Sequence, residues 1–282
     1  MSKKQLIMET AIQLFAEKGI DATSVQQITD TCGISKGAFY LSFKSKDELI
    51  VSIIDYFMKK ITSQIDHTVN NNSDPEDKLY HYYYQSFFLM EQHFDLAIVF
   101  MKEQSQTVNE TILEIINHYE MMMNQLLHSM LLQLYPKSEQ HIYDLIIVVN
   151  GLIAGYVQHF FKKSLGDQFD LHLLATSLVE KTNILAEHMK KPYFTKEMYA
   201  LQQDKRIAIT KNDILKEADT LRSYINDELI LDSISITLEQ LEQTNPHKTI
   251  VAGMLANLQA DPVCSWFCYL VRKYLDEKKQ SL

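Results

Sequence analysis

The sequence predicts an all-α protein. It contains only 7 glycines and 5 prolines in 282 residues, so long stretches run without either helix breaker. Apolar residues recur at helical spacing along most of the chain, and we find no strand-like alternation of apolar and polar residues. An apolar content of 46% is enough to fill a core, and a charged content of 22% excludes a disordered polymer.

The first fifty residues predict four helices separated by short breaks. The apolar pattern of the first helix ends at Gly19, a residue suited to the C-terminal end of a helix. A capping-box pattern at Thr23–Gln26 predicts the start of the second helix. Ser35 is expected to cap a short third helix. A second capping box at Ser45–Glu48 opens a long fourth helix with one apolar side.

The remainder of the chain predicts further helices, with proline or glycine in several of the breaks. Residues 70–75 form a clear break, in which Asp74 is expected to cap the next helix and Pro75 to occupy its first position. Pro136, Gly166 and Pro192 lie between or after predicted helices. The expected ranges are 76–91, 94–104, 107–134, 139–164, 171–189, 195–203, 211–243, 247–258 and 262–279, with ends uncertain by about two to four residues.

A turn that contains Gly33 separates the second and third predicted helices, which is the arrangement of a helix-turn-helix. Ile28, Ile34 and Phe39 would hold these two helices together, and the third would lie in the major groove of DNA. The charge distribution agrees. Residues 1–46 carry six lysines and four carboxylates, a local surplus of positive charge in a chain whose net charge is −9. A slightly basic segment on an acidic body predicts a local DNA-binding module.

Several stretches in order resemble the TetR family of transcriptional regulators. They are GISKGAFY at residues 33–40 and FKSKDEL at 43–49, preceded by AIQLFAEKG at 11–19 and TSVQQI at 23–28. The resemblance covers about residues 5–55. It implies a DNA-binding homodimer whose C-terminal domain takes a small molecule and then releases a double-stranded operator.

Nine residues of this segment are candidates for DNA contact. Hydroxyl groups at a helix N-terminus meet phosphate, and Lys36 reaches a guanine edge or a phosphate. Small residues at 37 and 38 let the helix approach the bases, and the Ala38 methyl group would contact a thymine methyl. The resemblance implies phosphate contacts for Tyr40 and Lys46. The full set is Thr23, Ser24, Ser35, Lys36, Gly37, Ala38, Tyr40, Lys44 and Lys46.

Three regions are expected: a DNA-binding domain at 1–48, a ligand-binding and dimerisation domain at 49–192, and additional helices at 193–282. Family members typically end near the position of Pro192, so the last region is extra. The ligand is expected to be small and lipophilic, because flexible methionines and aromatic residues suit a cavity for such molecules. For any single one of these residues, ordinary core packing is the alternative. The candidates are Phe87, Met90, Phe94, Met101, Tyr119, Met122, Met123 and Leu126.

The predicted helix 139–164 carries Gly151, Ala154 and Gly155, whose small side chains allow a second helix to approach closely. The resemblance implies that helices 139–164 and 171–189 form a four-helix interface in a two-fold dimer. The apolar run at residues 145–161 is interpreted as a buried helix of a soluble protein, because its length is marginal for a membrane span. No membrane partner is expected. The N-terminus lacks a signal-peptide pattern, which predicts a cytoplasmic protein.

The resemblance also implies a mechanism, in which ligand binding among helices 76–134 shifts the fourth helix, 46–65, and separates the two recognition helices. The regulator would then be a repressor, with activation or ligand-dependent co-repression as alternatives. A different class of function is a ligand-binding or protein-interaction module with a vestigial helix-turn-helix. The lysines at 36, 44 and 46 and Tyr40 argue against that alternative.

An enzyme is not expected, because the common phosphate-loop, dinucleotide, hydrolase and zinc-protease motifs do not occur. Cys32 is interpreted as a small buried hydrophobic residue, with a redox sensor as the alternative. Cys264 and Cys268 lie four residues apart, but two thiols without two further ligands make a poor zinc site. We therefore expect no metal and no cofactor.

Overall fold

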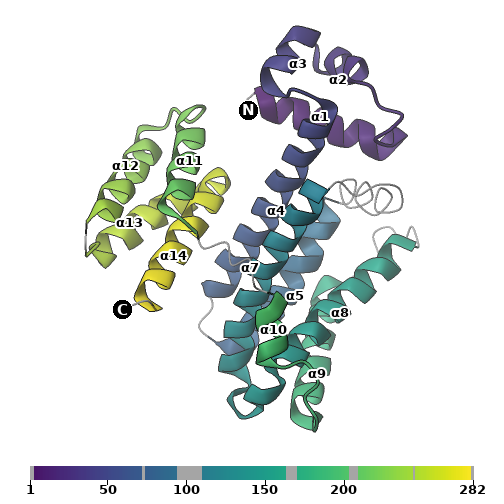
Figure 1. The fold of residues 1–282 in the computed structure, drawn as a ribbon, viewed down its shortest axis with the longest axis vertical. Coiled ribbons are helices and arrows are strands. Elements are labelled where there is room, and N and C mark those ends of the chain that lie inside the picture. Colours follow the sequence, from purple (N-terminus) through teal and green to yellow (C-terminus); the bar gives the residue numbers. More distant parts are fainter. Residues whose placement is uncertain are drawn as a thin grey trace. The chain divides into compact units, whose positions relative to one another are not determined.

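The computed structural model describes residues 3–71, 74–93, 110–162, 170–202, 209–243 and 245–280. Within these residues every regular element is a helix, so the all-α prediction is confirmed (Figure 1). The chain forms two compact units, Met1–Lys205 and Arg206–Leu282. Each unit is described by itself below.

The first unit begins with four helices, α1 (Lys3–Lys18), α2 (Val25–Cys32), α3 (Lys36–Ser42) and α4 (Lys46–Asn70). Helices α1, α2 and α3 surround the N-terminal turns of α4 (Figure 1). The shared core consists of buried aliphatic and aromatic side chains, among them Ile7, Ala11, Phe15, Ile28, Phe39, Phe43, Leu49 and Ile53. Phe39 therefore packs inside, as the sequence predicted, and Phe43 packs in the same core.

The start of α2 differs by one residue from the predicted capping box. Ser24 is the N-cap, its hydroxyl accepts a hydrogen bond from the backbone N–H of Gln27, and the Gln27 side chain accepts one from the Ser24 N–H. Thr23 instead lies fully buried, and its hydroxyl donates to the carbonyl of Gly19 at 2.8 Å. The sequence placed the cap one position too early because threonine and serine stand side by side and both suit the position.

Helix α4 is opened by Ser45, whose hydroxyl accepts from the Glu48 N–H at 3.0 Å. The Glu48 carboxylate reaches back to the N–H of Lys44 at 2.7 Å. The predicted capping box at Ser45–Glu48 is thus formed as a variant, in which the Glu48 side chain accepts from the N–H of the residue before the N-cap. The helix then continues for 25 residues, five beyond the predicted end at 65.

The lower part of the first unit consists of α5 (Pro75–Gln92), α7 (Glu110–Leu134), the short 3-10 helix η1 (Pro136–His141), α8 (Ile142–Lys162) and α9 (Leu171–His188). Asp74 caps α5 by accepting from the N–H groups of Glu76 and Asp77, and Pro75 occupies the first turn, as predicted. The predicted helix 94–104 lies outside the described residues.

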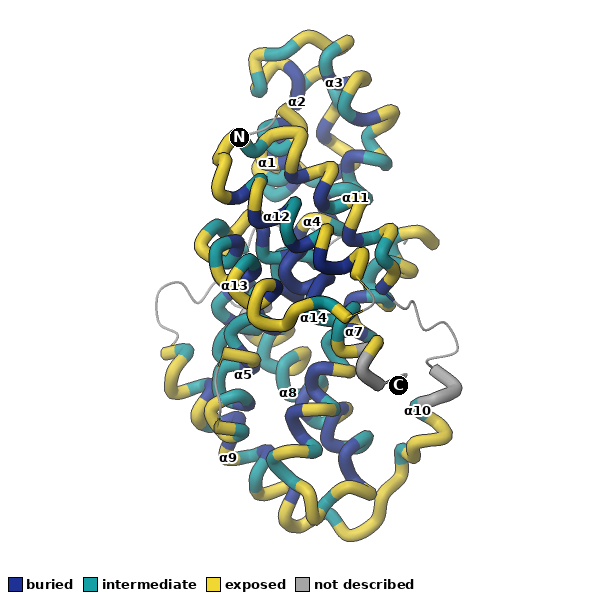
Figure 2. Tube along the Cα trace, turned by 90° about the vertical axis from the view of Figure 1, so that its left-hand side faces the viewer, coloured by how far each residue is buried: buried dark blue, intermediate teal, exposed yellow. Residues whose placement is uncertain are grey.

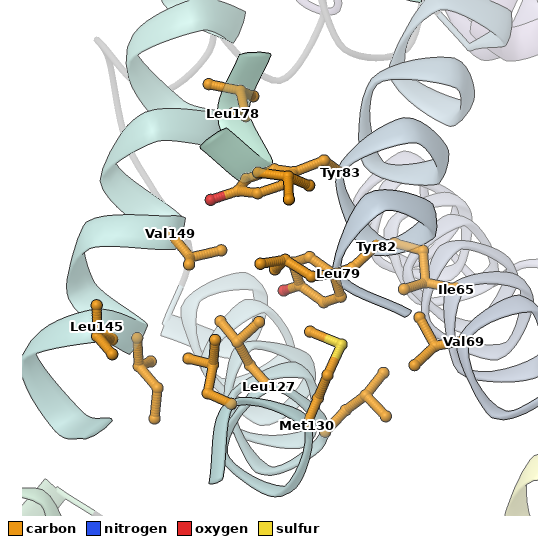
Figure 3. Close-up of a cluster of buried hydrophobic side chains, with 14 of the residues drawn as sticks. Ile65, Val69, Leu79, Tyr82, Tyr83, Leu127, Met130, Leu145, Val149 and Leu178 are labelled. Carbon is orange, nitrogen blue, oxygen red and sulfur yellow. The ribbon is translucent and has the colours of Figure 1, made fainter. Parts of the chain in front are cut away.

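Five helices supply the core of this lower part (Figure 3). Ile65 and Val69 come from the C-terminal half of α4, while α5 contributes Leu79 and two tyrosines. Leu127 and Met130 of α7, Leu145 and Val149 of α8 and Leu178 of α9 complete the cluster. The buried Tyr83 hydroxyl is 2.7 Å from the hydroxyl of Thr182, so this polar group is satisfied inside the core.

The region around α8 is the one stretch of the described residues long and apolar enough, by length and composition, to cross a membrane. It covers Pro136–His159 with a mean hydropathy of 1.3, and only 28% of that window is buried inside the chain. The sequence interpretation of a buried helix is therefore incomplete, because residues on one side of α8, among them Ile147, Gly151 and Gly155, are exposed.

Residues after α9 fold back onto the first unit. The Asp144 carboxylate accepts hydrogen bonds from the backbone N–H groups of Tyr193 and Phe194, at 2.8 and 3.0 Å. Helix α10 (Lys196–Gln202) follows, and its Tyr199 ring lies 4.9 Å from the ring of Tyr143 on α8. The start of the C-terminal unit is thus better placed at 206 than at the predicted 193.

The second unit contains α11 (Lys211–Arg222), α12 (Glu228–Glu242), α13 (Lys248–Gln259), the 3-10 helix η2 (Pro262–Cys264) and α14 (Ser265–Gln280). The prediction of one helix over 211–243 is wrong, because the chain breaks between α11 and α12. Asp227 caps α12 by accepting from the Ile230 N–H. This break contains no glycine or proline, and for that reason the sequence pattern concealed it.

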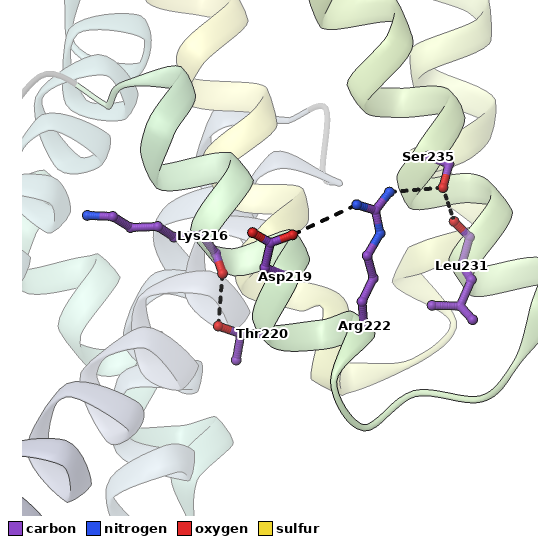
Figure 4. A network of polar contacts seen from close by, with 6 residues as sticks. All are labelled: Lys216, Asp219, Thr220, Arg222, Leu231 and Ser235. Atoms are coloured by element: carbon purple, nitrogen blue, oxygen red, sulfur yellow. Dashed lines mark hydrogen bonds and ion pairs between the residues drawn. The ribbon is translucent and has the colours of Figure 1, made fainter.

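Polar contacts tie the two sides of that break together (Figure 4). Arg222, the last residue of α11, donates to the Ser235 hydroxyl of α12 at 3.0 Å and lies 3.9 Å from the Asp219 carboxylate. The Ser235 hydroxyl in turn donates to the Leu231 carbonyl. These partly exposed contacts orient the two helices, while burial of apolar side chains supplies most of the stability.

The start of α14 carries a cluster of packed aromatic side chains. Trp266, Phe267 and Tyr269 are buried, and the Trp266 and Tyr269 rings stack at 4.9 Å. Cys264 and Cys268 are also buried, and burial raises the pKa of each thiol to about 12. These thiols therefore stay protonated and act as small apolar side chains.

The turn between α2 and α3 depends on Gly33, whose φ is +66°. We predict that Gly33→Ala costs about 1–2 kcal/mol through the left-handed backbone alone, since a Cβ there meets nothing within 4 Å. Gly37→Ala is the matched control, because Gly37 lies in α3 and alanine favours a helix. Amide hydrogen exchange in α2 and α3 should rise about five- to thirtyfold in the first variant only. Equal exchange in both variants would contradict the assignment.

Candidate DNA interface and regulatory core

The short helix α3 presents one side to solvent and the other to the N-terminal core. Lys36, Gly37, Tyr40 and Leu41 are exposed, at a spacing that places them on one face, whereas Phe39 is fully buried. Ser35 caps the helix by accepting from the Ala38 N–H at 3.2 Å. Figure 2 shows exposed stretches in yellow in the part of the chain labelled α3. This open face, on a helix fixed from behind, is the geometry of a recognition helix.

Leu41 is a residue of this face that the sequence analysis missed. Its side chain is 90% exposed, the highest value among the large apolar residues of the described chain that are counted as exposed. The signal was present in the sequence, since Leu41 follows Lys36 and Gly37 at helical spacing, on the side opposite Phe39 and Phe43. An exposed aliphatic side chain here is suited to contact with a thymine methyl group.

The N-terminus of α2 lies beside α3 and offers Ser24. This serine is exposed, and it begins a helix whose free N–H groups favour an anion. Thr23, its predicted companion, requires a correction. Thr23 is fully buried and its hydroxyl donates to the Gly19 and Leu14 carbonyls, so its role is to hold the preceding turn.

The two lysines before and at the start of α4 point in different directions. Lys44 is exposed to solvent. The ammonium group of Lys46 instead donates to the backbone carbonyls of Ile20 at 2.8 Å and Thr23 at 3.1 Å. The structure thus places Lys46 against the protein, whereas the sequence analysis assigned it to phosphate.

The predicted ligand-binding residues divide into three groups. Phe87, Tyr119, Met122 and Leu126 are buried, while Met90 and Met123 are half-buried. Phe94 and Met101 lie outside the described residues. The described members come from α5 and α7, and the Phe87 ring meets the Tyr156 ring of α8 edge-on at 6.5 Å. They thus face the interior of the lower part.

A polar contact at the edge of this region was not predicted. The Tyr119 hydroxyl on α7 donates to the Asp55 carboxylate on α4 at 2.7 Å, and Asp55 also forms an ion pair with Lys59 at 3.0 Å. Tyr119 itself is only 2% exposed. The contact links a residue of the apolar interior to the helix that carries the N-terminal domain.

The N-terminal helices match a known protein family. The family model described as bacterial regulatory proteins, tetR family, matches residues 7–53, which comprise α1 to α3 and the first turns of α4. Residues 7–53 thus carry the N-terminal domain of the TetR family of transcriptional regulators. The TetR assignment agrees with the resemblance read from the sequence, and it applies directly to the helix-turn-helix described above.

Three known proteins are similar to this chain in sequence or in structure. It is 29% identical to the HTH-type transcriptional regulator YerO of Bacillus subtilis, over 91% of this chain and 89% of that one. It is 26% identical to the Fatty acid metabolism regulator protein of Bacillus subtilis, over 42% of this chain and 62% of that one. The solved structure of the fatty acid degradation regulator FadR from Bacillus halodurans covers 67% of this chain and 100% of its own, with 24% identity and a TM-score of 0.56.

These coverages bear on the C-terminal unit. Arg206–Leu282 follows a first unit of 205 residues, so an alignment with YerO over 91% of the chain extends well into the second unit. The FadR structure, in contrast, matches only two thirds of the chain. Part of the C-terminal unit is thus similar in sequence to YerO.

The predicted dimer residues lie on an open helix face. Gly151, Ala154 and Gly155 are exposed, and a Cβ built on either glycine meets nothing within 4 Å. Ile147 extends the same stripe at 50% exposure. In the part of the chain that the structure describes, no group of three or more His, Cys, Asp or Glu side chains is arranged to hold a metal ion.

The link between α7 and α4 yields a prediction. Tyr119→Phe removes the hydroxyl that donates to Asp55 but keeps the buried ring, so we expect a loss of about 1 kcal/mol in the free energy of unfolding. Tyr56→Phe is the control, since Tyr56 adjoins Asp55 on α4 and its side chain is 41% exposed. It should change the stability by less than about 0.5 kcal/mol. Urea denaturation of the full chain measures the free energy of unfolding of both variants. A Tyr119→Phe variant with the stability of wild type would contradict a stabilising contact between Tyr119 and Asp55.

Proposed function

We propose that this regulator acts as a dimeric repressor that leaves its operator when a small lipophilic molecule binds in the lower part of the first unit. The observation that carries the proposal is the open face of α3, which is fixed from behind by Phe39 and Phe43. A helix held in this way enters the major groove as a rigid unit, so that its register on the bases is determined by the whole N-terminal core.

The proposed DNA-contacting residues follow from exposure. The residues proposed to face base edges are Lys36, Gly37, Ala38 and Leu41. Tyr40, at the edge of this α3 face, would reach phosphate. Ser24, Ser35 and Lys44 would contact the backbone on either side. Thr23 leaves the predicted set because its side chain is buried. The Lys46 ammonium group donates to two backbone carbonyls in this structure, and its contact with phosphate stays a prediction.

The lipophilic ligand is supported by the side chains of the lower part. Buried Phe87, Met122 and Leu126 lie on α5 and α7, and methionine adapts its shape to apolar molecules. A relative of this chain is named a fatty acid metabolism regulator, which agrees with a ligand of this class. The ligand shifts the equilibrium only by its differential affinity for the DNA-binding and released conformations.

The proposed dimer interface combines α8 and α9. On α8, Ile147, Gly151, Ala154 and Gly155 form an uncharged exposed stripe. On α9, which packs against α8, Leu173 is 67% and Ile184 is 52% exposed. A second copy would cover these apolar side chains in an isologous interface and place two recognition helices roughly 34–36 Å apart, one turn of DNA.

The competing function is a ligand-binding or protein-interaction module with a vestigial helix-turn-helix. It is not favoured, because the α3 face retains an exposed lysine, an exposed tyrosine and an exposed leucine on a fully packed helix.

DNA binding is tested by titrating the full chain against the DNA around its own gene at several salt concentrations. Wild type should bind one fragment tightly, with a negative slope of log affinity against log salt. Lys44→Met should make that slope less steep by about 0.9, the contribution of one phosphate contact. Leu41→Ala should leave the slope unchanged and weaken only the specific fragment, by about 1 kcal/mol or more.

The two variants control for one another, because one removes a charge and the other removes only apolar surface. Neither side chain is buried, so both proteins should keep the stability of wild type within about 0.5 kcal/mol. Absence of specific binding by wild type on every fragment would reject the repressor and favour the vestigial module.

The dimer is tested by Ile147→Glu, which places a charge in the centre of the proposed interface. Sedimentation velocity should show wild type at twice the chain mass of 32.8 kDa and the variant at the mass of one chain. Leu113→Glu, at a 45% exposed leucine of α7, is the matched control and should leave the dimer intact. A variant that remains dimeric would show that the interface lies elsewhere.

A further inference from the structure

We propose that residues 190–199, which we call the strap, contact a second copy of this chain through Tyr193, and that Asp144 is the positioning residue that places them there. The inference rests on the proposed dimer and adds a segment to it. The proposed dimer face belongs to α8 and α9, whereas the strap follows the end of α9. Tyr193 is used neither by the proposed DNA contacts nor by the proposed ligand site.

Both oxygens of the Asp144 carboxylate hold the strap. One accepts a hydrogen bond from the backbone N–H of Tyr193 at 2.8 Å, and the other accepts one from the N–H of Phe194 at 3.0 Å. These donors lie 49 and 50 residues away in sequence. Phe194 is half-buried, whereas Tyr193 is 79% exposed. The strap is therefore fixed by its backbone, with one ring turned inward and the other toward solvent.

A second anchor lies one residue earlier on α8. The Tyr199 ring is 4.9 Å from the Tyr143 ring, which in turn lies 5.3 Å from the His128 ring of α7. Tyr143 and Asp144 are consecutive, so their side chains leave the helix about 100° apart. The strap is thus held on two sides of the first turn of α8, and the residues between the two anchors have little freedom to move away.

Asp144 stands at one end of the exposed stripe of α8. Residues three, seven and eleven positions apart share a face of a helix. Asp144 therefore lies on the side that carries Ile147, Gly151 and Gly155, all of which are exposed. The hydrogen bond to Asp144 brings the Tyr193 backbone to this end of the stripe. The exposed tyrosine thus lengthens the proposed dimer face beyond α8 itself.

The end of α9 lies close to the same place. The Ser138 hydroxyl, which belongs to the helix η1 just before α8, donates to the Ala186 carbonyl in the last turn of α9 at 3.1 Å. Near this end of α9, Ile184 is 52% and Leu185 is 40% exposed. The strap therefore joins two helix ends that both carry exposed apolar side chains, and Tyr193 adds a third element to them.

Electrostatics explain why the strap makes this end of the stripe suitable for burial. Residues 145–159 contain no Asp, Glu, Lys or Arg, so Asp144 is the charge at which the uncharged stripe ends. Removing a carboxylate from water is costly unless it is hydrogen-bonded. The strap satisfies both oxygens of Asp144, and its position in the first turn of α8 also favours a negative charge.

The occupant is a second copy of this chain, because the strap continues the face that the proposed dimer covers. Each contact of an isologous interface occurs twice, so the two copies together would bury two Tyr193 rings. Tyrosine suits the edge of such an interface, since its ring is apolar and its hydroxyl can reach water.

The experiment measures the dissociation constant of the dimer by sedimentation of dilution series of the full chain. Tyr193→Ala should weaken the dimer about tenfold or more, because two buried rings are lost. Asp144→Ala should weaken it by a similar factor by releasing the strap. The double variant should be no weaker than Asp144→Ala alone, because a released ring has no contact left to lose. Leu113→Ala, at a 45% exposed leucine of α7, is the control and should keep the wild-type constant.

Amide hydrogen exchange at residues 193 and 194 tests the positioning role without the dimer. In chains made monomeric by Ile147→Glu, Asp144→Ala should accelerate exchange at both amides, because it removes their acceptor. Tyr193→Ala should leave this exchange unchanged, since it keeps both backbone hydrogen bonds.

Three outcomes would count against the proposal. A wild-type dissociation constant in Tyr193→Ala would overturn the contact with the second copy. Additive losses in the double variant, or unchanged exchange in Asp144→Ala, would overturn the positioning role of Asp144. A monomeric wild type, or a dimer that survives Ile147→Glu, would instead reject the proposed α8–α9 interface, and the strap contact with it.

Discussion

The structure depends on one helix whose side chains belong to two separate hydrophobic cores. The first turns of α4 contribute Leu49, Ile53 and Phe57 to the N-terminal core, and its last turns contribute Ile65 and Val69 to the core of the lower part. Its 25 residues extend about 37 Å at 1.5 Å per residue. Because both cores are close-packed and resist deformation, neither can shift along α4 without a discrete change of packing. In the proposed function, ligand and DNA would therefore communicate through α4.

Two polar contacts fix how α4 meets its neighbours, and they differ in what they can transmit. Apolar packing is non-directional and tolerates small rotations of a helix. The hydrogen bonds from Lys46 to the Ile20 and Thr23 carbonyls and the one from Tyr119 to Asp55 are directional, with donor–acceptor distances of 2.7–3.1 Å. Each weakens steeply when the helix rotates or slides. Both contacts are only partly buried. They therefore contribute modestly to stability while restricting the orientation of α4.

The sequence predicted the helices and the helix-turn-helix well because these depend on local patterns. Gly19 and Gly33 both have positive φ, and Asp74 caps α5 as its position before a proline suggested. Directions of side chains were less predictable. Lysine has a long, flexible stem, so the sequence alone could not show that Lys46 turns toward carbonyls 23 and 26 residues away.

Two further predictions were wrong, one because two neighbouring residues suit the same position and one because the deciding contacts join distant residues. Thr23 and Ser24 have similar preferences for the N-cap position of a helix. Which of them becomes the cap depends on which hydroxyl the preceding turn buries. The end of α11 carries no helix breaker, and only the Arg222 contacts with α12 show why the chain reverses there. The candidate ligand residues were identified by type, but their arrangement depends on five packed helices that no local pattern specifies.

The exposed side of α8 is the feature that most requires a second molecule. The helix is anchored in its own unit by polar groups: Asp144 holds the backbone at residues 193 and 194, and Asn150 donates to Asn124 of α7 at 2.7 Å. Those anchors fix which side of α8 faces outward. The outward side carries glycines and alanine, which bury little area individually but permit close approach of another helix over several turns. In the proposed dimer an identical helix would offer the same uncharged surface, which fits an isologous two-fold interface.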